Sequence, residues 1–202
     1  MFSCIIPTIW KSKRIVKLVE DLVNSDLVGE IIIIDNDFSN SIKLIDSPKI
    51  EIIKMNENIF VNPAWNLGVG LSKFDNIALI NDDINFDSNV FELFKNNELK
   101  DIGIIGMSTS NYNLSKNEHV RYVSSNGINY GWGCLILFHK DNYVPIPEDL
   151  KIWCGDNWLA SKIKTNVLFG LKIETEMSTS SGSLFRDIQE NDSKLFYSKY
   201  KD

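Results

Sequence analysis

Four consecutive isoleucines at residues 31–34, followed directly by Asp35, constrain the fold of this chain most strongly. An uninterrupted apolar run of this length is typical of a parallel strand that is covered on both faces. Similar runs recur along the first half of the chain, with helical apolar spacing between some of them, which predicts βαβ units on a parallel sheet. The other strands expected there are residues 2–6, 50–53, 77–80 and 102–105.

Two helices are predicted between these strands. Apolar residues at positions 15, 18, 19 and 22 recur at helical spacing, and Gly29 is expected to end that helix. The second helix is expected over residues 63–71, with Asn62 as its N-cap and Pro63 at its first position.

The second half of the chain is less regular. It contains a polar stretch at residues 108–118, a proline-bearing loop at 143–147, a Ser/Thr/Gly linker at 178–183 and a polar helical tail from Leu184 onward. We expect strands at residues 134–139 and 167–171, with a helix starting near Asp156. No internal repeat or domain boundary is visible, and 202 residues suit one α/β domain.

Composition and charge exclude several classes of protein. Hydrophobic residues make up 44% and charged residues 24%, the balance of a globular domain rather than a disordered chain. A net charge of -6 argues against a nucleic-acid partner, because proteins that bind nucleic acids usually have a basic face. No apolar stretch approaches the roughly 18 residues of a membrane span. The three cysteines lack zinc spacing and predict reduced, packed thiols, so a cytoplasmic location is expected.

Polar side chains follow three of the predicted strands. Pro7-Thr8, Asp35-Asn36-Asp37 and Asn81-Asp82-Asp83 stand where residues 2–6, 31–34 and 77–80 end. In an open parallel sheet, ligands bind beyond the carboxyl ends of the strands. The adjacent carboxylates at 82 and 83 repel each other unless a cation neutralises them, and a hard divalent cation could also bridge a diphosphate. A helix N-cap or a turn would explain the same triplet, so both interpretations stay open here.

Four motifs in this order resemble family 2 glycosyltransferases of the GT-A fold: IIPT, IIIIDN, NIFVNPAWNLG and ALINDD, ending at residues 8, 36, 68 and 83. The chain is also similar to the minimal glycosyltransferase domains of large algal viruses. The resemblance implies one GT-A domain over residues 1–202, with a mostly parallel central sheet flanked by helices. Residues 1–106 would form its nucleotide-sugar-binding half, and residues 107–202 its acceptor-binding half with a C-terminal helix.

On the donor side the resemblance assigns roles residue by residue. Thr8 and Asn36 would contact the nucleobase in a pocket shaped by Pro7 and Asp35. The other donor-side residues that it implies are Asn58, Asn66 and Asp82. Asp83, with Asn81, would hold Mn²⁺ or Mg²⁺. Arg186 is a candidate clamp on the diphosphate, with a solvated arginine on the terminal helix as the alternative.

The chain departs from the family pattern at three places. Phe60 stands where the family often has glycine, and Asn81 occupies the first position of the DxD-type motif. The late segment at residues 174–178 lacks the histidine that serves as a metal ligand in many such enzymes. Glu176 or another group could substitute for it.

The acceptor side is expected in the second half. Residues 131–134 resemble a glycine-containing acceptor loop, and residues 154–159 resemble the segment that carries the catalytic carboxylate. Asp156 would be the general base, or simply a helix N-cap. The acceptor contacts implied are Trp132, Gly133, Trp153 and Asn157.

Tryptophans inside or beside these motifs suit a sugar ligand, because a flat ring with a polar edge matches a sugar face. We expect Trp65 and Trp158 to be core residues instead. His119 and His139 are expected to be structural or surface residues.

The resemblance implies metal-dependent, inverting transfer of a hexosyl or deoxyhexosyl group from a nucleotide-diphosphate donor to a hydroxyl acceptor such as a glycan. The donor in this family is most often a UDP-sugar. dTDP and GDP donors stay open. A sugar-1-phosphate nucleotidyltransferase is disfavoured, because no glycine-rich basic loop follows residues 2–6. The alternative from another class is a non-catalytic nucleotide-sugar or glycan-binding module with a degenerate GT-A fold.

Overall fold

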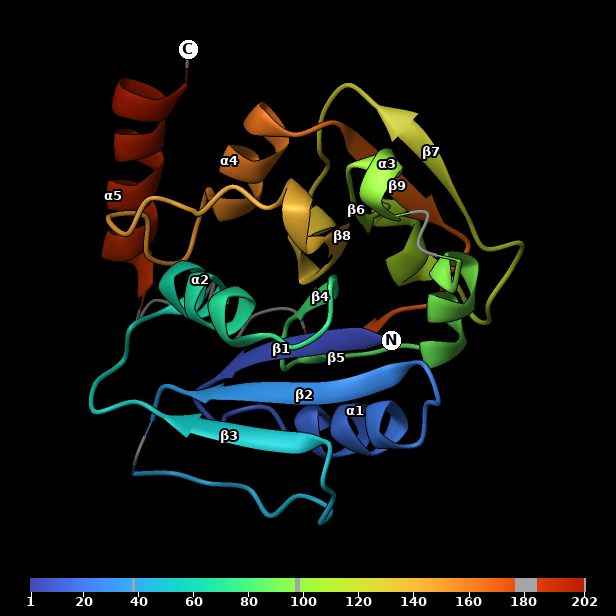
Figure 1. Cartoon of the computed structure of the whole chain (residues 1–202). Coiled ribbons are helices and arrows are strands. Elements are labelled where there is room, and N and C mark those ends of the chain that lie inside the picture. Colours follow the sequence, from blue (N-terminus) through green and yellow to red (C-terminus); the bar gives the residue numbers. More distant parts are fainter. Residues whose placement is uncertain (38, 97–98, 177–184, 202) are drawn as a thin grey trace.

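The isoleucine run lies in a strand at the centre of one half of a mixed sheet. The computed structural model of the chain describes residues 1–37, 39–96, 99–176 and 185–201. Eight of its strands form one sheet in the order β3-β2-β1-β4-β8-β6-β9-β7 (Figure 1). Their bounds are β1 Phe2–Thr8, β2 Val28–Asp35, β3 Ile50–Lys54, β4 Asn76–Ile80, β6 Ile104–Met107, β7 Arg121–Ser125, β8 Leu135–His139 and β9 Thr165–Phe169.

Helices flank this sheet, and a second, two-stranded sheet lies beside it. The helices are α1 Arg14–Val23, α2 Val61–Leu71, α3 Leu99–Ile102, α4 Gly155–Lys162 and α5 Arg186–Leu195. The small sheet pairs β5 Ile84–Asn85 with β10 Glu174–Thr175, which are far apart in sequence. A 3-10 helix spans Ser88–Phe94, and a π-helical turn over Phe196–Tyr200 continues α5.

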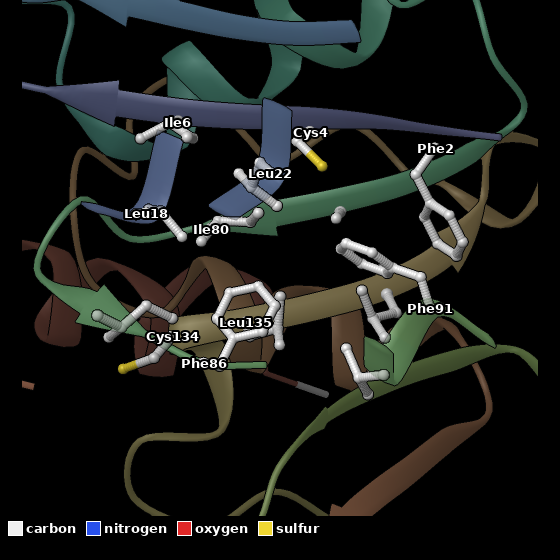
Figure 2. Packing of buried hydrophobic residues seen from close by; sticks show 14 of the residues in the cluster. Phe2, Cys4, Ile6, Leu18, Leu22, Ile80, Phe86, Phe91, Cys134 and Leu135 are labelled. Atoms are coloured by element: carbon white, nitrogen blue, oxygen red, sulfur yellow. The ribbon is translucent and has the colours of Figure 1, made fainter. Parts of the chain in front are cut away.

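Alternate isoleucines of β2 point into two different cores. Ile31 and Ile33 belong to the core on the α1 side, whereas Ile32 and Ile34 belong to the core on the α2 and α4 side. All four are at most 1% exposed, so the prediction of a strand covered on both faces is confirmed. Figure 2 shows part of the first core, in which Leu18 of α1 lies near Ile80 of β4.

The sheet is mostly parallel, as predicted. Four pairings are parallel, β1–β2, β1–β4, β2–β3 and β6–β9, and three are antiparallel, β4–β8, β6–β8 and β7–β9. The parallel strands β1, β2 and β4 bring their carboxyl ends to one edge of the sheet, where the polar clusters follow them.

Several element boundaries differ from the sequence predictions. The first helix ends at Val23, and Gly29 lies inside β2, where a Cβ would stand 2.2 Å from the ring of Phe74. The helix expected from Pro63 begins at Val61 with Phe60 as its N-cap, so the prediction that Asn62 caps it is wrong. The Asn62 amide instead donates to the carbonyl oxygens of Leu150 and Trp153, at 3.3 and 3.2 Å.

The second half shows further shifts. The strand expected over residues 102–105 begins at 104, because Ile102 ends α3. The strand expected over 167–171 occupies 165–169 and ends before Gly170, whose φ is +83°. The edge strand β7 was not expected, because it has no apolar run, and the linker predicted at 178–183 lies outside the described residues. No helix in the described part of the chain is long and apolar enough to cross a membrane.

Candidate functional site

The ends of β1 and β4 are joined through Thr8 and Asp82. The Thr8 hydroxyl donates to Oδ2 of Asp82 at 2.6 Å, and its oxygen accepts the backbone N–H of Trp10 at 2.9 Å. The first and third polar clusters expected from the sequence therefore meet in space, because their parallel strands are neighbours in the sheet.

The second cluster, after β2, lies beside the first. The Asp35 carboxylate accepts the indole N–H of Trp10 at 2.7 Å and the backbone N–H of Asp37 at 3.1 Å. Asn36 donates its backbone N–H to the Thr8 carbonyl at 2.9 Å, and its side-chain oxygen accepts the N–H of Ile59 at 3.2 Å. We use the word rim for the polar residues that follow β1, β2 and β4. Asp35 supports this rim through its hydrogen bonds, and Asn36 connects the rim to the loop before α2.

A pocket opens over these three clusters. We call it the first pocket, and it holds five expected donor-side residues together with both expected metal ligands. Its lining residues are Pro7, Thr8, Ile9, Asn36, Asn58, Phe60, Val61, Asn81, Asp82, Asp83, Ile152 and Phe185.

A second pocket adjoins the first and shares a wall with it. The shared residues are Val61, Asn81, Asp83 and Ile152. The second pocket also includes Gly133, Trp153, Asp156 and Asn157, all expected on the acceptor side. Asp83 therefore faces two adjoining spaces, one lined by the expected donor residues and one by the expected acceptor residues.

The two rim carboxyls hold their protons more tightly than ordinary aspartates. Burial is the largest cause that raises the pKa of Asp82, to about 6, and the negative charges of Asp83 and Glu176 add to it, while the Thr8 hydrogen bond acts in the opposite direction. Burial and Glu176 also raise the pKa of Asp83, and Arg14 lowers it. Both shifts mean that ionised carboxylates are costly here, chiefly because they are buried and in part because other carboxylates are near, and a bound cation would offset this cost.

Glu176 reaches this rim from the far end of the sequence. The pairing of β10 with β5 brings its backbone N–H within 3.3 Å of the Asp83 carbonyl oxygen. Its carboxylate accepts a hydrogen bond from the Ser12 hydroxyl at 3.2 Å and lies 3.5 Å from Nε of Arg14. The late segment that lacks a histidine thus supplies a carboxylate beside the rim.

The residues at the rim fit a divalent cation as an incomplete set of oxygen ligands. Within residues 1–37, 39–96, 99–176 and 185–201, no group of three His, Cys, Asp or Glu side chains could hold a metal ion by itself. Asp83 and Asn81 offer two oxygen donors on the shared wall. Mg²⁺ sites are often completed by one or two carboxylates, substrate phosphates and water, so this set suits a cation that arrives with a phosphorylated ligand.

Asp156 lies near the start of α4, in the second pocket. Cys154 is the N-cap of that helix, so the interpretation of Asp156 as its N-cap is wrong. Its Oδ1 accepts the N–H of Asn157 at 2.9 Å, and burial raises the pKa of its carboxyl. A Cβ on Gly133 would stand 3.0 Å from its Oδ2, so the glycine leaves room for this carboxylate.

Backbone strain concentrates around the two pockets. Among the described residues, the non-glycine residues with positive φ are Trp10 (59°), Phe60 (67°) and Cys154 (62°). Each such conformation costs on the order of 1–3 kcal/mol and persists where surrounding structure enforces it, often at functional sites. Phe60 lines the first pocket, Cys154 lines the second, and Trp10 bonds to the rim residues Thr8 and Asp35.

Four expected site residues lie outside both pocket linings, and one of them is Asp35, whose hydrogen bonds are given above. Asn66 donates to the Ile146 carbonyl at 2.7 Å and accepts from the Tyr143 hydroxyl at 2.7 Å, so its amide holds the loop after β8. Trp132 is 0% exposed and donates its indole N–H to the Asn166 carbonyl at 3.0 Å. Arg186 is the exposed first residue of α5.

The tryptophans divide differently from expectation. Trp65 is a core residue at 4% exposure, as expected, and Trp132 is a second one. Trp158 is only partly buried and donates to the Pro145 carbonyl at 3.0 Å. Pocket residues that sequence reasoning missed include Val61, Ile152, Tyr130 and Phe185. Val61 lies within the NIFVNPAWNLG motif without an expected role, and the other three belong to no motif and converge only through the fold.

The mixed sheet flanked by helices has the GT-A fold, which the solved structures that resemble this chain share. No protein-family model and no curated protein sequence matches this chain.

Solved structures of this fold resemble the chain over most of its length. S. aureus TarS 1–349 in complex with UDP-GlcNAc is similar, with a TM-score of 0.62 and 13% identity over 100% of this chain and 68% of that one. GalNAc-T7 with UDP, GalNAc and Mn²⁺ is similar with a TM-score of 0.65 and 11% identity, over 87% of this chain and 43% of that one. At such identities the likeness establishes the fold alone. The chain spans 40% of the longer S. aureus TarS chain that it matches.

Proposed function

We propose that this chain is a glycosyltransferase that moves a hexosyl or deoxyhexosyl group from a nucleotide-diphosphate donor to a hydroxyl acceptor. The observation that carries the proposal is the shared wall of the two pockets, where Asp83 and Asn81 face both spaces. A transfer reaction needs two ligands whose reacting atoms meet, and two pockets that adjoin at a polar wall provide this arrangement.

A UDP-sugar is the proposed donor, in the first pocket. The similar structures were solved with UDP-GlcNAc in one case and with UDP, GalNAc and Mn²⁺ in the other, which supports a donor of this class here. Thr8 and Asn36 would meet the nucleobase, with Asn58 at the loop beside it. Asp82 would meet the ribose.

Asp83, with Asn81, would hold Mn²⁺ or Mg²⁺. The cation would supply positive charge that stabilises the departing diphosphate. Glu176 adds a carboxylate next to Asp83 and strengthens the negative potential that attracts a cation to this rim. The donor diphosphate itself would complete a ligand set that two protein oxygens leave open.

Asp156 would act as the general base in the second pocket. It would take the proton of the acceptor hydroxyl as that oxygen bonds to the anomeric carbon and the bond from that carbon to the diphosphate oxygen breaks. Attack from the side opposite the leaving group inverts the anomeric centre. Burial raises the pKa of this carboxyl. A higher pKa makes its ionised form a stronger base, closer to the value that is most effective near neutral pH.

The acceptor would be a glycan or another hydroxyl compound. Trp153, Gly133 and Asn157 line the second pocket beside Asp156, and the exposed rings of Tyr130 and Tyr197 line it as well. Aromatic rings with a polar edge suit the apolar faces and polar rims of sugars.

One observation favours a second candidate, a non-catalytic nucleotide-sugar-binding module. The described residues contain no complete metal-ligand cluster. Such a module would bind the donor without turning it over.

UDP release separates the two candidates. Purified protein is incubated with UDP-GlcNAc, UDP-GalNAc or UDP-glucose and Mn²⁺, with and without a glycan acceptor mixture, and free UDP is measured. The transferase proposal predicts UDP release that EDTA abolishes and that Asp156→Asn reduces. Binding of UDP-sugar without any UDP release would contradict the transferase proposal and support the module.

A further inference from the structure

Phe60 adopts a backbone conformation that is otherwise almost confined to glycine. Its φ and ψ are 67° and -176°. This region is essentially restricted to glycine, because a Cβ crowds the neighbouring peptide groups.

The surroundings of Phe60 impose that conformation on its backbone. Its N–H donates to Oδ1 of Asn58 at 2.8 Å, and its carbonyl accepts the N–H of Ala64 at 3.3 Å at the start of α2. The same carbonyl accepts from the Asn36 amide at 3.4 Å. A glycine would satisfy all of these bonds with less strain, since only main-chain atoms of residue 60 take part.

The ring of Phe60 contributes little to the described cores. Its chain neighbours Ile59 and Val61 pack against the α2-side core, whereas Phe60 belongs to neither core cluster of the described residues. The ring lines the first pocket and lies 6.0 Å from Nζ of Lys151, at the limit of a cation–π contact. The strain is therefore not offset by packing within the described protein.

We infer that the Phe60 ring is a ligand-contact group, which stacks on the planar nucleobase of the donor in the first pocket. This inference rests on the proposed function. The pocket places flat apolar surfaces, from Phe60, Phe185 and Pro7, beside the side-chain amides of Asn36 and Asn58. A nucleobase has a matching form, with a π-face for stacking and an edge for hydrogen bonds. The diphosphate has no such flat face, so the ring should contact the nucleobase and not the diphosphate.

Two substitutions at this position separate the ring from the backbone strain. Phe60→Ala removes the ring but keeps a Cβ, whereas Phe60→Gly removes the ring and also allows the positive φ. Both variants should bind UDP and uridine about 5- to 100-fold more weakly than the wild type, the range found when a stacked aromatic ring is removed. Both should bind pyrophosphate with Mn²⁺ as the wild type does. Phe60→Gly should melt about 2–12 °C above Phe60→Ala, because only glycine relieves the strain.

Phe169→Ala is the control for the loss of an aromatic ring outside the two pockets. That ring also makes a cation–π contact, 5.8 Å from the Arg121 guanidinium, but it lines neither the first nor the second pocket. Its loss should leave the affinity for UDP unchanged.

Calorimetric titrations with UDP, uridine and pyrophosphate, together with thermal melts, test the inference. Weaker uridine and UDP binding with unchanged pyrophosphate binding in both Phe60 variants supports it. If the wild type binds UDP and both variants bind it equally well, the inference about Phe60 is wrong and the proposed function stands. If the wild type binds no UDP, the proposed function fails and this inference fails with it.

Discussion

Replacing Asp192 with alanine removes one carboxylate that holds three consecutive backbone amides. Asp192 lies on α5 and is 2% exposed. Its Oδ1 accepts the N–H of Lys151 at 3.1 Å, and its Oδ2 accepts the N–H groups of Ile152 and Trp153 at 2.8 and 2.9 Å. This segment contributes Ile152 and Trp153 to the second pocket and leads directly to Asp156.

The expected loss follows from those three bonds. A hydrogen bond to a charged group contributes about 1.5–3 kcal/mol net, and an unsatisfied buried donor costs about 1–3 kcal/mol. Residues 151–153 are only partly buried, so water can reach some of the freed N–H groups after the substitution. We therefore expect Asp192→Ala to lower the free energy of unfolding by about 3 kcal/mol. Asp192→Asn keeps one acceptor oxygen and should lose about half as much.

Urea denaturation followed by tryptophan fluorescence measures this loss, with Asp149→Ala as the matched control. Asp149 bonds to Lys199 and Tyr200 of the same C-terminal region, but its side chain is 42% exposed. Exposed pairs contribute at most about 1 kcal/mol. In conditions where Asp192→Ala is folded, it should also lower kcat for transfer more than it weakens UDP binding. A loss below about 1 kcal/mol for Asp192→Ala, equal to that of Asp149→Ala, would refute the reasoning.

Three further predictions concern the pocket carboxylates. Asp156→Asn should reduce transfer at least about 100-fold and leave the Kd for UDP within about twofold, and equal loss of both would contradict its role as a base. Burial raises the pKa of Asp156, so its base form is lost as the pH falls, beginning above the ordinary pKa range of aspartate. The kcat of the wild type should therefore decline on the acidic side of its pH profile, and this decline should be absent in Asp156→Asn. A flat pH profile for the wild type would count against Asp156 as the base. Asp83→Ala should abolish Mn²⁺ binding in the presence of UDP, measured by electron paramagnetic resonance, with the exposed Asp87→Ala as control; unchanged Mn²⁺ binding would exclude Asp83 as a ligand.

The half of the sheet around β2 was predictable from the sequence because its signals are local. The isoleucines at 31–34 are buried on both faces of the sheet, so the apolar run alone identifies the strand. The polar residues after β1, β2 and β4 could be placed together because parallel strands end at the same edge. The meeting of Thr8 with Asp82 follows from that rule.

Other parts of the site depend on contacts between segments that are distant in sequence. Asn62 reads as a helix cap, but its amide is used by Leu150 and Trp153, about ninety residues later. Glu176 reaches the rim only through the pairing of β10 with β5, two-residue strands without any pattern. The sequence indicates that the indole of Trp132 could contact an acceptor. In the structure it packs against Gly106, where a Cβ would stand 2.2 Å from the ring.

The position of UDP in a crystal grown with UDP and Mn²⁺ tests the central claim most directly. The account predicts the nucleobase in the first pocket near Thr8, Asn36 and Phe60, with the diphosphate directed toward the wall that the two pockets share. It also predicts an anomalous manganese peak beside Asp83. UDP bound elsewhere on the protein, or a first pocket that stays free of nucleotide at saturating UDP, would contradict the account.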